Sequence, residues 1–287
     1  MQRIIFFFYF CCVMNTQTYL KHRIMKARKR ILYFVAVVAI LFVACEKEEP
    51  LQPDPTPEQE SPVFVQNAVT DFDGNSYTAV QIGNQLWMAE NLRTTHFADG
   101  GDIAIGAVFN DHTPYRYYPG MDEANLEEYG FLYNWNAVMH GADTCENEQQ
   151  GIQGICPDGW HVPTDSEWNE MEGCLTTADV TATGVRGDHA GKLAGGGTWL
   201  TSNAVGSPGN YDDAHRNSSG FSALPAGGIF GEPYYVRWAA HFWTATGAGG
   251  IYACQHYMYY NNCGVCRSRE LKESALSVRC VKDPVSD

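Results

Sequence analysis

The pattern of polar and apolar residues between positions 157 and 175 predicts a turn followed by a helix with one buried face. Pro-Asp-Gly at 157–159 is typical of a tight turn, because proline fixes φ and glycine accepts a left-handed conformation. Thr164 and Glu167 have the spacing of a capping box at a helix start. The apolar residues that follow recur at intervals of three and four, as on one helix face: Trp168, Met171 and Leu175.

Short apolar and aromatic runs on both sides of this helix predict β-strands separated by turns. Residues 63–70 and 76–82 flank an Asp- and Gly-containing turn, and a second tight turn is expected at 83–85. Short helices are expected after the aromatic run 129–138 and around 189–193. Later strands are expected at 241–246, 251–259, 267–271 and 275–282. Together these elements predict an α+β domain of antiparallel strands with two or three short helices and many loops.

The first 62 residues have the composition of a leader and a tether. Residues 31–44 carry no charge and follow a basic stretch from Met25, which is typical of a secretory signal and short for a membrane span. We therefore expect residues 1–24 to be an over-long gene start and residues 25–44 to be the signal peptide. The run 41–45, LFVAC, resembles a bacterial lipobox, so Cys45 is predicted to carry a lipid.

The residues after Cys45 indicate export to a surface. The acidic run 46–49 resembles the signal that sends Bacteroidetes-type lipoproteins to the outer face of the outer membrane. Residues 50–62 are rich in Pro and acid, which predicts an extended tether through residue 62. The folded domain is expected to be a single unit over residues 63–287.

Charge is distributed unevenly and excludes some classes of partner. The chain has 19 basic and 33 acidic residues, a net charge of −14, and all acids lie after position 44. Seven bases precede position 45, so the remainder carries 19 − 7 = 12 bases against 33 acids. A strongly acidic exported part lacks the basic footprint that nucleic acid or anionic lipid requires, so no nucleic-acid partner is expected.

Five stretches occur in a fixed order along the chain: DFDGNSYTAVQIGNQLWMAENLRTT, YGFLYNWNAV, CPDGWHVPTDSEW, GFSALPAGG and LSVRCVKD. Over residues 69–283 they resemble the Fibrobacter succinogenes major paralogous domain. The resemblance implies a domain on secreted or lipid-anchored proteins, with a fold akin to C-type lectins and to formylglycine-generating, sulfatase-modifying enzymes. It implies no established activity.

The cysteines after the signal predict disulfides, because an exported compartment permits them. The preferred pair is Cys156 with Cys280, which joins the CPDGW turn to the last strand; Cys145 with Cys156 is the local alternative. A second disulfide is expected among Cys254, Cys263 and Cys266. The CxxC spacing at 263–266 also fits half a zinc site or a redox pair, although neither has the context it needs.

The first functional hypothesis is a non-catalytic domain that binds an extracellular glycan or protein. Exposed aromatic side chains stack on sugars or anchor protein partners, and the candidates are Tyr234, Tyr235, Trp238, Tyr257, Tyr259 and Tyr260.

The alternatives are an enzyme and a calcium lectin. A metal- or cysteine-dependent enzyme related to formylglycine-generating enzymes is implied by the resemblance alone, because no local catalytic motif is present; no cofactor and no metal are expected. Glu-Pro-Tyr at 232–234 departs from the EPN sugar motif of C-type lectins. An oxygen-rich loop is the weak candidate for structural calcium: Asn210, Asp212, Asp213 and Asn217.

Overall fold

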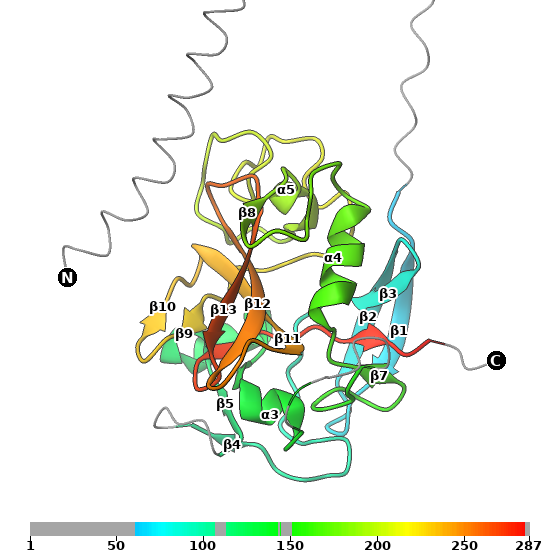
Figure 1. Cartoon of the computed structure of the whole chain (residues 1–287), viewed down its shortest axis with the longest axis vertical. Coiled ribbons are helices and arrows are strands. Elements are labelled where there is room, and N and C mark those ends of the chain that lie inside the picture. The colour runs from blue at the N-terminus through cyan, green and yellow to red at the C-terminus, as the bar shows by residue number, and fades with distance from the viewer. Residues whose placement is uncertain (1–60, 107–112, 143, 145–150, 285–287) are drawn as a thin grey trace, which may run out of the picture. The chain divides into compact units, whose positions relative to one another are not determined.

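The computed structural model describes residues 61–106, 113–142, 144 and 151–284, which belong to one compact unit, Gln59–Asp287 (Figure 1). The expected signal peptide, the lipidated Cys45 and Cys145 lie outside the described residues, as does nearly all of the tether. None of the helices in the described ranges combines the length and apolar character that a membrane span requires. The domain consists mostly of antiparallel sheets with a few short helices, which confirms the α+β prediction.

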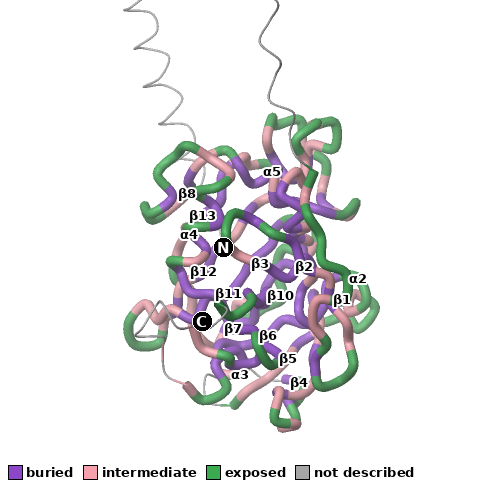
Figure 2. The backbone as a smooth tube through the Cα atoms, turned by 90° about the vertical axis from the view of Figure 1, so that its right-hand side faces the viewer, coloured by how far each residue is buried: buried purple, intermediate pink, exposed green. Residues whose placement is uncertain are grey.

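One sheet brings the first strands of the domain together with its last strand. Its strand order is β1 (Phe64–Thr70), β2 (Ser76–Ile82), β3 (Gln85–Met88), β15 (Val281–Lys282) and β7 (Trp160–His161). Ile82 pairs with Gln85, so Gly83 and Asn84 form the expected two-residue turn, and Gly83 has a φ of 58° that suits glycine. β1 is an exposed edge, whereas β2 and β3 are largely buried (Figure 2).

The second sheet is built from short strands that are distant in sequence. Its strand order is β10 (Pro233–Tyr234), β9 (Gly228–Ile229), β14 (Ala275–Leu276), β6 (Leu132–Asn134), β5 (Tyr115–Tyr117) and β4 (Ala104–Ile105). The β4–β5 pair is parallel and the others are antiparallel.

The third sheet carries the longest strands and two of the aromatic residues singled out from the sequence, Tyr257 and Tyr259. Its order is β11 (Ala239–Gly247), β12 (Tyr252–Tyr259), β13 (Val265–Leu271) and β8 (Gly184–Arg186), all antiparallel. Three of these strands match the predicted runs to within two residues.

The helices are short, as the sequence predicts. They are α2 (Leu126–Tyr129), α3 (Trp135–Met139), α4 (Asp165–Gly173) and α5 (Ala190–Leu193), with 3-10 turns η1 (Pro119–Met121) and η2 (Glu123–Asn125). α4 begins with the expected capping box: Thr164 Oγ1 accepts from the amide of Glu167, and Glu167 Oε2 accepts from the amide of Thr164. Trp168 and Met171 are fully buried, and Leu175 lies beyond the helix end, packed against the same core.

The expected strand 275–282 is wrong as a single element, because the chain changes sheets within it. β14 belongs to the second sheet and β15 to the first. Residues 277–280 bridge them: Trp243 of β11 donates its amide to Ser277 O, and the amides of Leu92 and Met88 donate to the carbonyls of Val278 and Cys280.

Arg279 lies in this bridging segment and is fully buried. Burial lowers the pKa of its guanidinium to about 9. The guanidinium donates to the carbonyls of Met88, Phe221 and Ser222 and to the amide oxygen of Asn91, so its N–H groups are satisfied by neutral acceptors. One side chain thus ties the last segment to two others far away in sequence.

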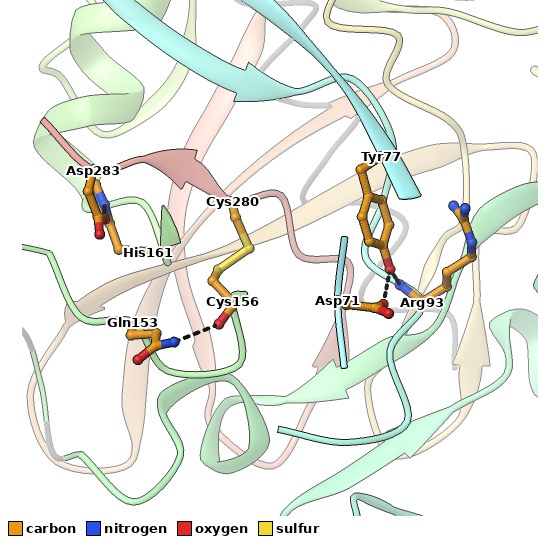
Figure 3. Close-up of a disulfide and its surroundings, with 8 residues drawn as sticks. All are labelled: Asp71, Tyr77, Arg93, Gln153, Cys156, His161, Cys280 and Asp283. Atoms are coloured by element: carbon orange, nitrogen blue, oxygen red, sulfur yellow. Dashed lines mark hydrogen bonds and ion pairs between the residues drawn. A yellow bond between two sulfur atoms is a disulfide. The ribbon is translucent and has the colours of Figure 1, made fainter. Parts of the chain in front are cut away.

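A disulfide joins Cys156 to Cys280, 124 residues apart, which is the pairing preferred from the sequence (Figure 3). Both cysteines are fully buried. The disulfide lies beside the ladder in which Val281 of β15 pairs with His161 of β7. The turn that precedes α4 is therefore fixed to the end of the chain both covalently and by backbone hydrogen bonds.

His161 forms an ionic clasp at the same place. Its Nε2 lies 2.7 Å from Glu167 Oε1 and its Nδ1 lies 2.7 Å from Asp283 Oδ1. Burial alone would lower the pKa of this imidazole, but the two carboxylates outweigh burial and raise it above its ordinary value of 6.5. Glu167 thereby serves two roles, capping α4 with one oxygen and binding His161 with the other.

Removing the disulfide should destabilise the domain by about 4–5 kcal/mol, since a closed loop of over a hundred residues restricts the unfolded chain strongly. We expect urea unfolding of Cys156→Ala/Cys280→Ala to show this loss relative to the oxidised protein. Cys174→Ala, which removes an exposed thiol, is the control and should unfold like the wild type. Equal stability of all three proteins would contradict the prediction.

The His161 clasp predicts a pH dependence of stability. Because the folded pKa is raised, the contribution is complete below pH 6.5 and is lost as pH rises through the folded pKa. We expect the free energy of unfolding to fall from pH 6.5 upward in the wild type and to fall less in His161→Gln. The check is a series of urea titrations of both proteins from pH 5.5 to 9; parallel profiles would rule out this clasp as the cause.

Candidate functional site

The two faces of the third sheet have different chemistry. Successive side chains of a strand point to opposite faces. In β12, His256 and Met258 point to one face, and Gln255, Tyr257 and Tyr259 point to the other. We call these the inner face, against which α4 packs, and the outer face.

The inner face carries a buried ion network that fixes α4 to the sheet. Glu172 of α4 is fully buried and accepts two bonds from Arg186 Nη2 of β8, at 2.9 and 2.7 Å. At the start of the helix, Asp165 accepts from Arg267 of β13 at 2.6–2.9 Å. Each carboxylate therefore has an arginine partner, which a buried charge requires.

His256 connects the two carboxylates of this network. Its Nδ1 lies 2.6 Å from Glu172 Oε1 and its Nε2 lies 3.0 Å from Asp165 Oδ1. Burial raises the pKa of Glu172, but bonds from His189 and His256 and the charge of Arg186 outweigh it and lower the pKa to about 2. His256 therefore links the first and the last turn of α4 through these two carboxylates.

The outer face carries His241 and four tyrosines. His241 of β11 pairs directly with Tyr257 of β12, and their rings are stacked 4.8 Å apart. Tyr259 lies 5.5 Å from Tyr257, Tyr235 lies 5.9 Å from Tyr259, and Tyr234 lies 4.8 Å from Tyr235 (ring centroids). We call Tyr234, Tyr235, Tyr257 and Tyr259 the tyrosine cluster.

The structure brings the six aromatic candidates into two neighbouring groups. Four form the tyrosine cluster, and Trp238 and Tyr260 form a pair with ring centroids 5.5 Å apart. Tyr234 is 50% exposed, Trp238 48% and Tyr235 37%, while the other three are half-buried. None of the six belongs to the fully buried core, so all of them can contribute to a binding surface.

The segment 234–238 is held in an uncommon backbone conformation. Tyr235 and Arg237 both have a φ of 70°, a region that costs a non-glycine residue about 1–3 kcal/mol. Gly227 lies directly beneath this segment: a Cβ there would come within 2.2 Å of the carbonyl oxygen of Tyr234. The amide of Arg237 donates to Pro225 O, so packing and hydrogen bonds fix the aromatic residues at the surface.

The expected second disulfide among Cys254, Cys263 and Cys266 is not formed within the described residues. Cys254 lies opposite Arg269, and Cys266 lies opposite Tyr257, three positions further along β12. An odd offset places the two thiols on opposite faces of the sheet, beyond the reach of a disulfide. Burial raises the pKa of the Cys266 thiol, which makes it a poor nucleophile.

Three of the four calcium candidates direct their side-chain oxygens to amides of the loop that contains them. Asp213 accepts from the amides of Gly206 and His215, and the side-chain oxygen of Asn217 accepts from the amide of Ser222. Asn210 accepts from the amide of Asp212. These bonds account for the polar composition of the loop. Across the described ranges, no three acidic, His or Cys side chains are grouped as a metal would require.

The roles of the polar residues that organise the two faces are not visible in local sequence. His241 and His256 look alike in sequence, since each lies within a strand of aromatic and apolar residues. Their difference depends on partners brought from α4 and β13, which no local pattern reveals. Distinguishing the two histidines requires the register of β11, β12 and β13, which determines the face to which each side chain points.

Comparison with known proteins identifies the family to which this fold and surface belong. No curated protein and no solved structure matches the chain. A family model described as the Fibrobacter succinogenes major domain matches residues 80–282, which include α4, the aromatic candidates, the second and third sheets and the first sheet from the end of β2 onward. The chain therefore belongs to the Fibrobacter succinogenes major domain family.

Proposed function

We propose that this protein is an exported lipoprotein of the outer membrane, exposed at the cell surface, whose domain binds an extracellular glycan or protein without catalysis. Family membership supports a surface protein of undetermined ligand. The lipobox-like residues before Cys45 and the acidic run after it support the anchor and the export.

The observation that carries the binding role is that aromatic residues from separate segments gather at one end of the third sheet, three of them exposed. Tyr234 ends β10, Tyr235 and Trp238 belong to the β10–β11 connection, and Tyr257, Tyr259 and Tyr260 lie at or just after the end of β12. Their rings bury large apolar areas when a ligand covers them, and their hydroxyl and indole groups supply hydrogen bonds. Such residues dominate the energetics of many binding sites.

The alternative is a metal- or cysteine-dependent enzyme with the architecture of formylglycine-generating enzymes. The kinship to that fold and to C-type lectins is itself a proposal, supported here by the family resemblance and the loop-rich antiparallel architecture. Cys254 and Cys266 project from opposite faces of the sheet, which does not favour a cysteine pair acting together. The aromatic surface makes binding the better-supported function.

Loss of the exposed rings should weaken ligand binding while leaving the fold intact. We expect Tyr234→Ala/Tyr235→Ala/Trp238→Ala to weaken binding of the full chain to its strongest hits on glycan and extracellular-protein arrays at least tenfold, about 1.4 kcal/mol. Phe72→Ala removes a ring that is 57% exposed on the β1–β2 turn and is the matched control. Equal loss in both variants, or none in the triple variant, would exclude this surface.

The lipid anchor predicts that one residue determines membrane association. In cells fed an alkyne fatty acid, the wild-type chain should incorporate the label and sediment with the outer membrane, and protease added to intact cells should digest it. Cys45→Ala should lose both label and sedimentation, whereas Cys174→Ala should retain them. Labelling that persists in Cys45→Ala would contradict the assignment.

A further inference from the structure

The outer face contains a buried polar atom without a partner, directly beneath the tyrosine cluster. His241 is only 3% exposed, and its Nε2 has no hydrogen-bond partner among the described residues. Its ring contacts Phe230 edge-on at 5.1 Å and lies nearly parallel to Tyr235 at 6.3 Å. Native structures pair most of their buried polar groups, so an unpaired nitrogen at this place points to a ligand.

The neighbours of His241 fix which ring nitrogen carries the proton. Burial lowers the pKa of this imidazole to about 4, so it is neutral at pH 7. Gln255 donates from Nε2 towards Ser268 Oγ at 3.2 Å and Glu270 Oε2 at 3.4 Å, which turns its Oε1 to His241 Nδ1 at 3.0 Å. Nδ1 must therefore be the donor, and Nε2 presents a lone pair that accepts a hydrogen bond.

We propose that the aromatic surface binds a neutral carbohydrate, and that a sugar hydroxyl donates a hydrogen bond to His241 Nε2 while the pyranose ring stacks on the tyrosine cluster. This inference rests on the proposed binding function and names its ligand class. Tyr235 lies next to His241, with ring centroids 6.3 Å apart, and is itself 37% exposed, so the proposed contact requires side chains around His241 to move aside.

Two features favour a carbohydrate over a protein, and a third favours a neutral carbohydrate over an anionic one. A pyranose offers an apolar face and hydroxyl donors together, which matches rings grouped around one acceptor. The aromatic surface involves only six residues, whereas a stable protein interface takes about 20–30 residues a side. The exported part carries 12 bases against 33 acids, which favours a neutral sugar over an anionic one because like charges repel.

The test is a binding titration of the full chain with a panel of neutral hexasaccharides, comprising gluco-, manno-, xylo- and galacto-oligosaccharides in α and β linkage. The wild type should bind at least one of them. His241→Phe keeps an aromatic ring in the stack and removes the acceptor, and it should weaken that binding at least tenfold. Phe72→Ala should bind like the wild type.

A measurement on the unaltered protein covers the case in which His241→Phe misfolds. With ¹⁵N-labelled histidine, the Nε2 resonance of His241 should show an unprotonated nitrogen that moves towards the protonated value when the hexasaccharide is added. A resonance that stays in place at saturating hexasaccharide would overturn the role of His241.

The outcomes separate this inference from the function on which it rests. If the wild type binds a protein ligand through the aromatic surface but no hexasaccharide, the carbohydrate inference fails and the binding function stands. Unchanged affinity in a folded His241→Phe also overturns the inference alone. If the triple aromatic variant binds every array ligand like the wild type, the carbohydrate inference and the proposed binding function of this surface both fail.

Discussion

The pairing of buried charges between α4 and the third sheet is the constraint on which the rest of the structure depends. Glu172 and Asp165 lie inside the protein and are ionised only because arginines and His256 surround them. Breaking a buried pair typically costs about 3–5 kcal/mol, because the remaining charge stays unpaired. The network therefore fixes the orientation of α4 relative to β12, β13 and β8, and with it the direction in which the opposite face points.

The sequence motifs of this family meet in space through a few long-range contacts. Arg279 from the LSVRC segment binds the carbonyls of Phe221 and Ser222 in GFSALP and of Met88 in the first motif. Cys156 of CPDGW is bonded to Cys280, with His161 and Asp283 in contact beside it (Figure 3). Motifs that look independent along the chain are thus parts of one central assembly.

Local patterns predict the elements of this protein well and its connections poorly. The capping box at Thr164 and the turn at Gly83 were predictable because their physics involves neighbouring residues. The division of residues 275–282 between two sheets was not, since it depends on hydrogen bonds to β11 and to residues 88–92. For the site, aromatic composition indicated six candidate rings, of which Tyr234, Tyr235 and Trp238 are exposed, but the unpaired Nε2 of His241 depends on the strand register.

The disulfide also determines how the domain transmits tension. Every aromatic residue of the outer face lies between Cys156 and Cys280, inside the covalently closed loop. A pull applied at Tyr235 reaches the N-terminal side of the chain along two covalent routes in parallel, one through residue 156 directly and one through residue 280 and the sulfur bridge. The backbone between residues 156 and 235 and the backbone between residues 235 and 280 cannot be extended independently, because the disulfide joins their far ends. A force on this surface is therefore shared between two backbone segments.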